Sequence, residues 1–515
     1  MDRRQFIGMS AMGAAAALAR PLAADMPAAF ELEEMSVAQL QDGMASGRFT
    51  AAALVQAYLG RIDAVDKHGP AINSVIELNP DAVAIAEELD RERKAKGPRG
   101  AMHGIPILIK DNIDTADRMH TTAGSLALAD SIAARDAAVA KRLRAAGAVI
   151  LGKTNLSEWA NFRSTHSTSG WSGRGGQTRN PYVLDRNCCG SSSGTGAAIA
   201  ANLAAVGVGT ETDGSVVCPS SACGLVGIKP TLGLIGGAGI IPIAHSQDTA
   251  GPMARSVADA AALLGAMSEE GHDYARFLKA DGLQGARIGV ARKYFGFNDH
   301  VDRLMKDAID VIKKLGATIV DPADMATTGK YDDTELEVLL YEFKSDLNEY
   351  LAALGPAVKT RTLADLIAFN DANREREMPY FGQELFERAQ KKGPLSETAY
   401  KKALAKNHRM SRAEGIDAVI KKHKLDAVIA PTGGPVWPTD LINGDHFTGG
   451  FSTASAVAGY PHVTVPAGDV FGLPVGLSFF AGARTEATLI KFAYAFEQAT
   501  MARRKPQFLA TTRTA

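Results

Sequence analysis

The chain has 515 residues, of which 46% are hydrophobic and 22% are charged, and its formal net charge is −1. These values are ordinary for a soluble globular protein, and because neither charge sign is in excess we expect no nucleic-acid partner. Beyond the N-terminus no run of 18 apolar residues occurs, so we expect no membrane-spanning helix and no stable membrane association.

The N-terminal residues 1–27 are typical of an export signal. Arg3 and Arg4 form an adjacent pair, and a short apolar stretch at 9–19 follows them. An arginine pair before a weak apolar region favours a twin-arginine signal over a Sec signal, and the alternative is a solvated N-terminal helix. The sequence therefore predicts export to a bacterial periplasm, followed by a single domain over residues 28–515.

Helical patterns and short apolar runs alternate along most of the chain. The helical patterns cover residues 36–45, 50–65, 80–94, 136–146, 195–203 and 256–267. The apolar runs, typical of strands buried on both faces, cover residues 104–109, 147–151, 204–208, 225–228, 286–291, 427–430 and 463–465. This alternation predicts an α/β fold with a large, mixed β-sheet covered by helices on both faces. Residues of about 333–423 are charged and helical, and we expect them to form a helical cap beside the sheet.

Four cysteines lie close together in the sequence. Cys188 and Cys189 are adjacent, and Cys218 and Cys223 are five residues apart, so a bond within either pair closes no long loop. We interpret all four as buried small hydrophobic residues. Their spacing suits no zinc site, and we expect neither a metal nor a cofactor.

Two clusters of glycine and serine are the densest functional signal. The first covers residues 189–196 and the second covers residues 207–215. Glycine and serine before a helix let backbone N–H groups approach a ligand closely and stabilise an oxyanion. Either cluster alone also suits an ordinary turn, but two clusters separated by one helix and one strand favour a site.

Two familiar motifs match the sequence but do not fit their surroundings. Residues 147–154 match the P-loop pattern, but Val149, Ile150 and Leu151 favour a buried strand over a pliant phosphate loop. Residues 190–194 match the Gly-x-Ser-x-Gly pattern around Ser192, but no apolar strand precedes them, as a nucleophile elbow requires.

A nucleophilic serine needs a base, and none of the scattered histidines stands out. Lys110, Lys153 and Lys229 each lie at the end of an apolar run, where burial can lower the pKa of an amine enough to keep it neutral. A lysine that reaches solvent along its stem is the ordinary alternative for each. The residue pattern alone does not choose among the three.

The motifs together resemble the amidase signature family. The matching segments, which span most of the chain, cover residues 104–112, 152–159, 189–196, 207–215, 227–231, 247–253 and 472–477. The resemblance implies a Ser–cis-Ser–Lys triad with Ser215 as nucleophile, Ser191 as the cis-serine and Lys110 as base. It also implies an oxyanion hole formed by the backbone N–H groups of Thr212, Asp213, Gly214 and Ser215, with Ser192 in a supporting role.

Some positions depart from the common family pattern. Many members carry Gly-Gly-Ser-Ile-Arg at the nucleophile, whereas this chain has Asp213 before Gly214 and valine at position 217. Ser193 also replaces a usual glycine. With these changes the chain most resembles the bacterial peptide amidases, which implies a peptide C-terminal amide as substrate. The alternatives are an aryl-acylamidase or other small-amide hydrolase, an α/β-hydrolase esterase that uses Ser192, and a periplasmic binding protein.

Overall fold

The structure is a computed structural model that describes residues 29–512, so the predicted export segment 1–27 lies outside the described residues. One mixed sheet of eleven strands runs through the described chain, in the order β1-β3-β2-β6-β8-β7-β12-β13-β11-β9-β10. Its strands are β1 (Val75–Leu78), β2 (Pro106–Lys110), β3 (Val149–Thr154), β6 (Val206–Glu211), β7 (Val226–Lys229), β8 (Thr249–Ala254), β9 (Arg287–Val290), β10 (Thr318–Val320), β11 (Ala427–Pro431), β12 (His462–Val470) and β13 (Leu473–Phe480). Every apolar run predicted as a strand forms one, and the mixed α/β fold is confirmed.

Parallel and antiparallel pairs share this sheet. Strand β2 pairs in parallel with both β3 and β6, whereas β8 pairs antiparallel with β6 and β7. Strands β2, β3 and β6 are buried along their whole length, as their nearly continuous apolar sequences predict. The register places Ile109 of β2 opposite Val208 of β6, so the residues that follow these strands lie at one edge of the sheet. A separate two-stranded ribbon pairs β4 (Trp171–Ser172) with β5 (Gly176–Gln177).

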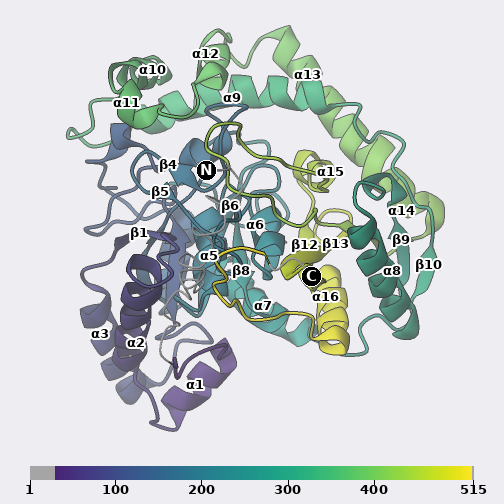
Figure 1. Ribbon diagram of the computed structural model, residues 1–515, viewed down its shortest axis with the longest axis horizontal. Coiled ribbons are helices and arrows are strands. Elements are labelled where there is room, and N and C mark those ends of the chain that lie inside the picture. Colours follow the sequence, from purple (N-terminus) through teal and green to yellow (C-terminus); the bar gives the residue numbers. More distant parts are fainter. Residues whose placement is uncertain (1–28, 513–515) are drawn as a thin grey trace, which may run out of the picture.

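Helices pack on both faces of the sheet (Figure 1). Those outside the cap are α1 (Val37–Ala45), α2 (Ala51–Ile62), α3 (Ala82–Lys96), α4 (Ala138–Ala145), α5 (Ser193–Ala200), α6 (Val217–Ala222), α7 (Val257–Met267), α8 (Asp299–Lys314), α15 (Thr453–Ala458) and α16 (Glu486–Thr500).

Residues 332–423 are mostly helical and arch along one side of the molecule in green (Figure 1). The helices of this segment are α9 (Asp332–Ala352), α10 (Leu363–Ala372), α11 (Arg374–Glu377), α12 (Glu384–Gln390), α13 (Thr398–His408) and α14 (Asp417–His423). A fully buried arginine, Arg163, fastens this segment to the body. Its Nη1 lies 2.8 Å from Glu158 Oε1 and donates to the backbone carbonyl of Glu377 in α11.

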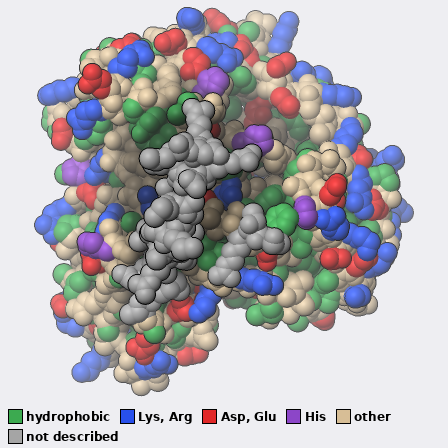
Figure 2. Space-filling model, in the orientation of Figure 1, with side chains coloured by type: hydrophobic (Ala, Val, Ile, Leu, Met, Phe, Trp, Pro, Cys, Tyr) green, Lys and Arg blue, Asp and Glu red, His purple; other side chains and the backbone are tan. Residues whose placement is uncertain are grey.

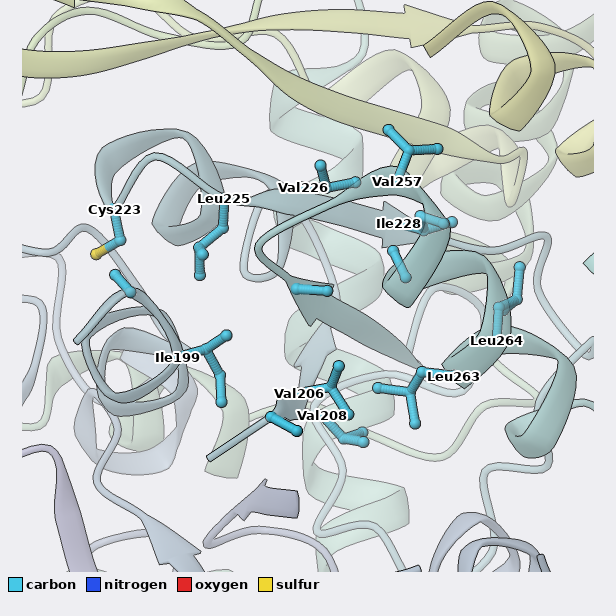
Figure 3. Packing of buried hydrophobic residues seen from close by; sticks show 14 of the residues in the cluster. Ile199, Val206, Val208, Cys223, Leu225, Val226, Ile228, Val257, Leu263 and Leu264 are labelled. Carbon is cyan, nitrogen blue, oxygen red and sulfur yellow. The ribbon is translucent and has the colours of Figure 1, made fainter. Parts of the chain in front are cut away.

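The core beside the two Gly/Ser clusters consists of aliphatic side chains from α5, α7 and the strands between them. Figure 3 shows Ile199 of α5, Val206 and Val208 of β6, and Leu263 and Leu264 of α7 among them. All five are fully buried. Burial of apolar surface contributes about 25 cal/mol per Å² to the free energy of folding, and it therefore stabilises the helices and strands that carry the two clusters.

The molecular surface carries charges of both signs. Figure 2 shows acidic and basic side chains interspersed over one face, with neither sign gathered into a large patch. Among the described residues no helix is both long and apolar enough to cross a bilayer.

Candidate active site

The two Gly/Ser clusters lie side by side because α5 and β6 join them. Ser191 and Ser192 come immediately before α5, and Ser215 lies in the turn between β6 and α6. The backbone N–H of Ser192 donates to the carbonyl of Ser215 at 3.2 Å, and the peptide bond between Gly190 and Ser191 is cis. A unit of one helix and one strand therefore places both serine segments at the same edge of the sheet.

Lys110 enters this edge from the neighbouring strand. It is the last residue of β2, next to β6 in the sheet, and it is fully buried. Its Nζ donates to Ser191 Oγ at 2.7 Å, to Thr210 Oγ1 at 2.9 Å and to the carbonyl of Thr210 at 3.3 Å. One hydrogen bond thus joins the amine to Ser191, and two hydrogen bonds to Thr210 keep the amine in that position.

Burial changes the acidity of this amine. Removal from water lowers the pKa of Lys110 from 10.5 to about 7, while the carboxyl groups of Asp248 and Glu211 oppose that shift. About half of the Lys110 side chains are then neutral at pH 7, and a neutral amine can accept a proton.

The other two candidate lysines are also fully buried but have different partners. Lys153 Nζ donates to the carbonyl of Ile113 at 2.6 Å and to Thr121 Oγ1 at 2.8 Å. Lys229 Nζ donates to the carbonyl of Pro230 at 3.0 Å, and burial lowers its pKa to about 8. Among the three lysines, Lys110 alone donates a hydrogen bond to a serine of the clusters.

The esterase alternative requires a histidine beside Ser192, but among the described residues the hydroxyl of Ser192 is bound to Thr210 instead. Its hydroxyl donates to the carbonyl of Thr210 at 3.1 Å and accepts from the N–H of Thr210 at 3.2 Å. Ser192 therefore holds the residue that in turn binds Lys110. The P-loop-like segment at 147–154 contains all of strand β3 and no phosphate loop.

The turn that carries Ser215 offers free backbone donors. Within the described part of the chain, the N–H groups of Asp213, Gly214 and Ser215 donate no hydrogen bond. Gly214 has a φ of 79°, a conformation that favours glycine, and a Cβ there would lie 3.0 Å from Ser452 Oγ. The turn can therefore present N–H groups to an anionic oxygen, as an oxyanion hole does.

Two acids that the sequence analysis did not single out hold this turn, and of these Glu211 is buried and Asp248 is partly buried. Glu211 Oε2 accepts from the N–H groups of Val216 and Val217 at 2.8 and 3.0 Å, directly after Ser215. Asp248 Oδ1 accepts from Thr212 Oγ1 at 2.6 Å, and burial raises the pKa of Asp248 to about 6. Both acids lie near Lys110 and favour its protonated form.

The interpretation of all four cysteines as buried small hydrophobic residues is wrong for two of them. Cys189 and Cys218 form a disulfide with a Cα–Cα distance of 6.0 Å, whereas Cys188 and Cys223 are free and buried. Closeness in the sequence points only to bonds within each neighbouring pair, Cys188 with Cys189 and Cys218 with Cys223. The α5–β6 connection instead brings one member of each pair together, across 29 residues.

A cavity of about 290 Å³, lined by polar and apolar residues in similar measure, lies beside the two serine segments. Its walls come from both segments, from the loop after β11 and from the start of α15. The lining residues are Asn161, Ser169, Cys189, Gly190, Asp213, Gly214, Val217, Cys218, Thr432, Trp437, Asp445, Phe447, Gly450, Ser452 and Thr453.

Asp213, the departure from the common family pattern, links the turn that carries Ser215 to α15. Its Oδ2 accepts from Thr453 Oγ1 at 2.7 Å. Burial and the neighbouring Asp213 raise the pKa of Glu335 in α9 well above its ordinary value. Gln247 links the same turn to α9, because its Nε2 donates to Glu335 Oε1 at 3.0 Å and to the carbonyl of Thr212 at 3.3 Å.

One group of side chains has the composition of a metal site. His245, Glu342 and Asp346 bring ligand atoms within 4.8 Å of one another. The hydrogen bond from His245 Nδ1 to Asp346 Oδ2, 2.8 Å long, raises the pKa of the imidazole to about 9. Glu342 Oε1 already accepts from Tyr400 OH at 2.7 Å. A protonated imidazole has no free lone pair for a metal, and its contacts with the two carboxylates are those of an ion pair.

Comparisons with known proteins identify the family. The family model for Amidase matches residues 53–490. The chain belongs to the amidase signature family. It is therefore an amide-hydrolysing enzyme, and this amidase has relatives in plants and in bacteria.

A probable amidase of Arabidopsis thaliana is 41% identical, over 93% of this chain and 93% of the relative. Among solved structures, the native peptide amidase from Stenotrophomonas maltophilia is 49% identical, with a TM-score of 0.88, over 93% of this amidase and 100% of that chain. An amidase family protein from Bacillus anthracis is 36% identical, with a TM-score of 0.83, over 92% of this amidase and 93% of that chain.

Proposed function

We propose that this amidase cleaves its substrate through an acyl-enzyme on Ser215, with Ser191 as proton relay and Lys110 as base. Neutral Lys110 takes the proton of Ser191 Oγ, and Ser191 takes the proton of Ser215 as its oxygen attacks the amide carbonyl. The observation that carries this proposal is the 2.7 Å hydrogen bond from the buried amine of Lys110 to Ser191 Oγ.

The second half of the reaction returns the same proton. Lys110 and Ser191 pass it to the leaving nitrogen as the C–N bond breaks, which releases ammonia or an amine. Water then attacks the ester on Ser215 with Lys110 again as base, and the carboxylic acid leaves. The N–H groups of Thr212, Asp213, Gly214 and Ser215 stabilise the tetrahedral oxyanion, at about 3–4 kcal/mol for each donor in comparable enzymes.

We propose the C-terminal carboxamide of a peptide as the substrate. Two observations support this choice: the 49% identity to a solved peptide amidase, and the cavity of about 290 Å³, with its mixed polar and apolar lining, beside the serine segments. We also propose that the enzyme works in the periplasm after twin-arginine export, and the adjacent Arg3 and Arg4 support this location.

A screen that measures ammonia released from the carboxamides and aniline released from the anilide tests the substrate. A peptide carboxamide, the anilide with the same acyl group and a simple carboxamide are compared by kcat/KM, with Ser215→Ala as the inactive control. The peptide carboxamide is expected to be the best of the three. A clear preference for the anilide assigns the enzyme to the aryl-acylamidase alternative, and activity that survives in Ser215→Ala contradicts the proposed nucleophile.

A further inference from the structure

The disulfide lies at the point where the two serine segments meet. Cys189 is two residues before Ser191, and Cys218 is three residues after Ser215. Other direct links between the two segments are hydrogen bonds, from Ser192 N to the carbonyl of Ser215 and between Ser192 Oγ and the backbone of Thr210. The disulfide is therefore a covalent bond between the segments whose spacing the proposed proton relay needs.

Each half of the bridge is also anchored to its own serine segment. Cys189 has a φ of 54°, in the left-handed region that residues with a Cβ rarely adopt. Its carbonyl accepts from Ser193 Oγ at 2.5 Å, one turn into the segment that carries Ser191. The N–H of Cys218 donates to the carbonyl of Gly214 at 2.8 Å, next to Ser215. A shift of either sulfur is thereby transmitted to a proposed catalytic serine.

We propose that the Cys189–Cys218 disulfide is a positioning element of the amide-cleaving site, and that a small dithiol reductant opens it from the cavity and lowers kcat. This inference rests on the proposed roles of Ser191 and Ser215.

The cavity gives a reductant access to this bridge. Both Cys189 and Cys218 line it, and Cys218 is only partly buried. The two free cysteines, Cys188 and Cys223, are fully buried and do not line the cavity. The chain thus holds a reachable disulfide and a shielded pair of thiols, which serves as an internal control.

The reduction itself is an ordinary thiol–disulfide exchange. A thiolate of the dithiol attacks the sulfur of Cys218, forms a mixed disulfide and displaces Cys189 as a thiolate, which takes up a proton. The second thiol of the reagent then attacks its own bound sulfur and releases Cys218. Two electrons move from the dithiol, which leaves as a cyclic disulfide, and the enzyme gains two thiols.

The test treats the native enzyme with dithiothreitol and follows kcat and KM separately. Reacted cysteines are identified by alkylation and mass spectrometry, and the assay temperature stays well below the Tm of the reduced form. We expect alkylation at Cys189 and Cys218, a fall in kcat of about tenfold or more with KM changed far less, and recovery on reoxidation. A bridge that resists reduction without denaturant, or an unchanged kcat after full reduction, overturns the proposal.

Variants separate positioning from stability. Cys189→Ala/Cys218→Ala is expected to match the reduced enzyme in kcat and to ignore dithiothreitol. Cys188→Ser is expected to keep the full response. If the double variant does not fold, the rate at which a fluorophosphonate labels Ser215 in the wild-type enzyme, before and after reduction, gives the same answer.

The two proposals fail in different ways. If the disulfide has no positioning role, Ser215→Ala and Lys110→Ala are still inactive and reduction changes nothing. If the triad is wrong, one of those two variants keeps its activity whatever the redox state.

Discussion

The acidity of Lys110 determines how this amidase should respond to pH. With a pKa of about 7, the amine is half neutral at pH 7. An amine at the ordinary value of 10.5 would be neutral in only about one molecule in 3,000 at that pH. Burial therefore supplies about three orders of magnitude of usable base. Below pH 7 the neutral fraction falls tenfold for each pH unit, so kcat/KM is expected to fall along an acid limb centred at about 7.

The assay measures kcat/KM for a carboxamide from pH 5 to pH 10 at constant ionic strength, with a Tm at each pH to exclude unfolding. Lys110→Arg is the matched variant, because a guanidinium has the same charge but stays protonated throughout this range. It is expected to be inactive at every pH. If a limb centred near 7 persists in Lys110→Arg, the titrating group is another one, and Asp248, with a pKa of about 6, is then the first candidate. That result would refute the assignment of Lys110 as base.

The remaining predictions concern the serines and export. Ser191→Ala breaks the relay and is expected to lower kcat by about a thousandfold or more, whereas Ser192→Ala removes only the support of Thr210 and is expected to cost roughly tenfold; steady-state kinetics checks both, and equal losses would show that the two hydroxyls are not distinguished as proposed. Replacement of both Arg3 and Arg4 by lysine is expected to leave folded precursor in the cytoplasm of a bacterial host, and cell fractionation that still finds it in the periplasm would contradict twin-arginine export.

The sequence predicts the strands that begin with a nearly continuous apolar run, because such a run is stable only when it is buried. Strands β2, β3 and β6 belong to this class. Strand β8, Thr249–Ala254, is equally buried but contains Pro252 and Gly251, which normally argue against a central strand. It forms because β6 and β7 pair with it from either side, and no local pattern expresses that context.

The candidate site divides along a similar line. Local residues mark Lys110, Lys153 and Lys229 equally, because burial at a strand end is common to all three. Only the three-dimensional structure shows which of them contacts a serine, and the family resemblance anticipated that position. The partners of the amine and of the turn, such as Thr210 and Asp248, carry no signal of their own, since a buried threonine or aspartate is defined by what it faces.

The joining of the serine segments by α5 and β6 has a consequence for how such enzymes diverge. The proposed reacting groups, Lys110, Ser191 and Ser215, occupy about a hundred consecutive residues, while part of the wall of the cavity comes from residues 432–450, more than two hundred positions later. Substitutions or insertions in that later stretch can reshape what is admitted and leave the chemistry untouched. Selectivity and reactivity are then inherited on separable lengths of chain, and an engineered change of substrate should begin with the later one.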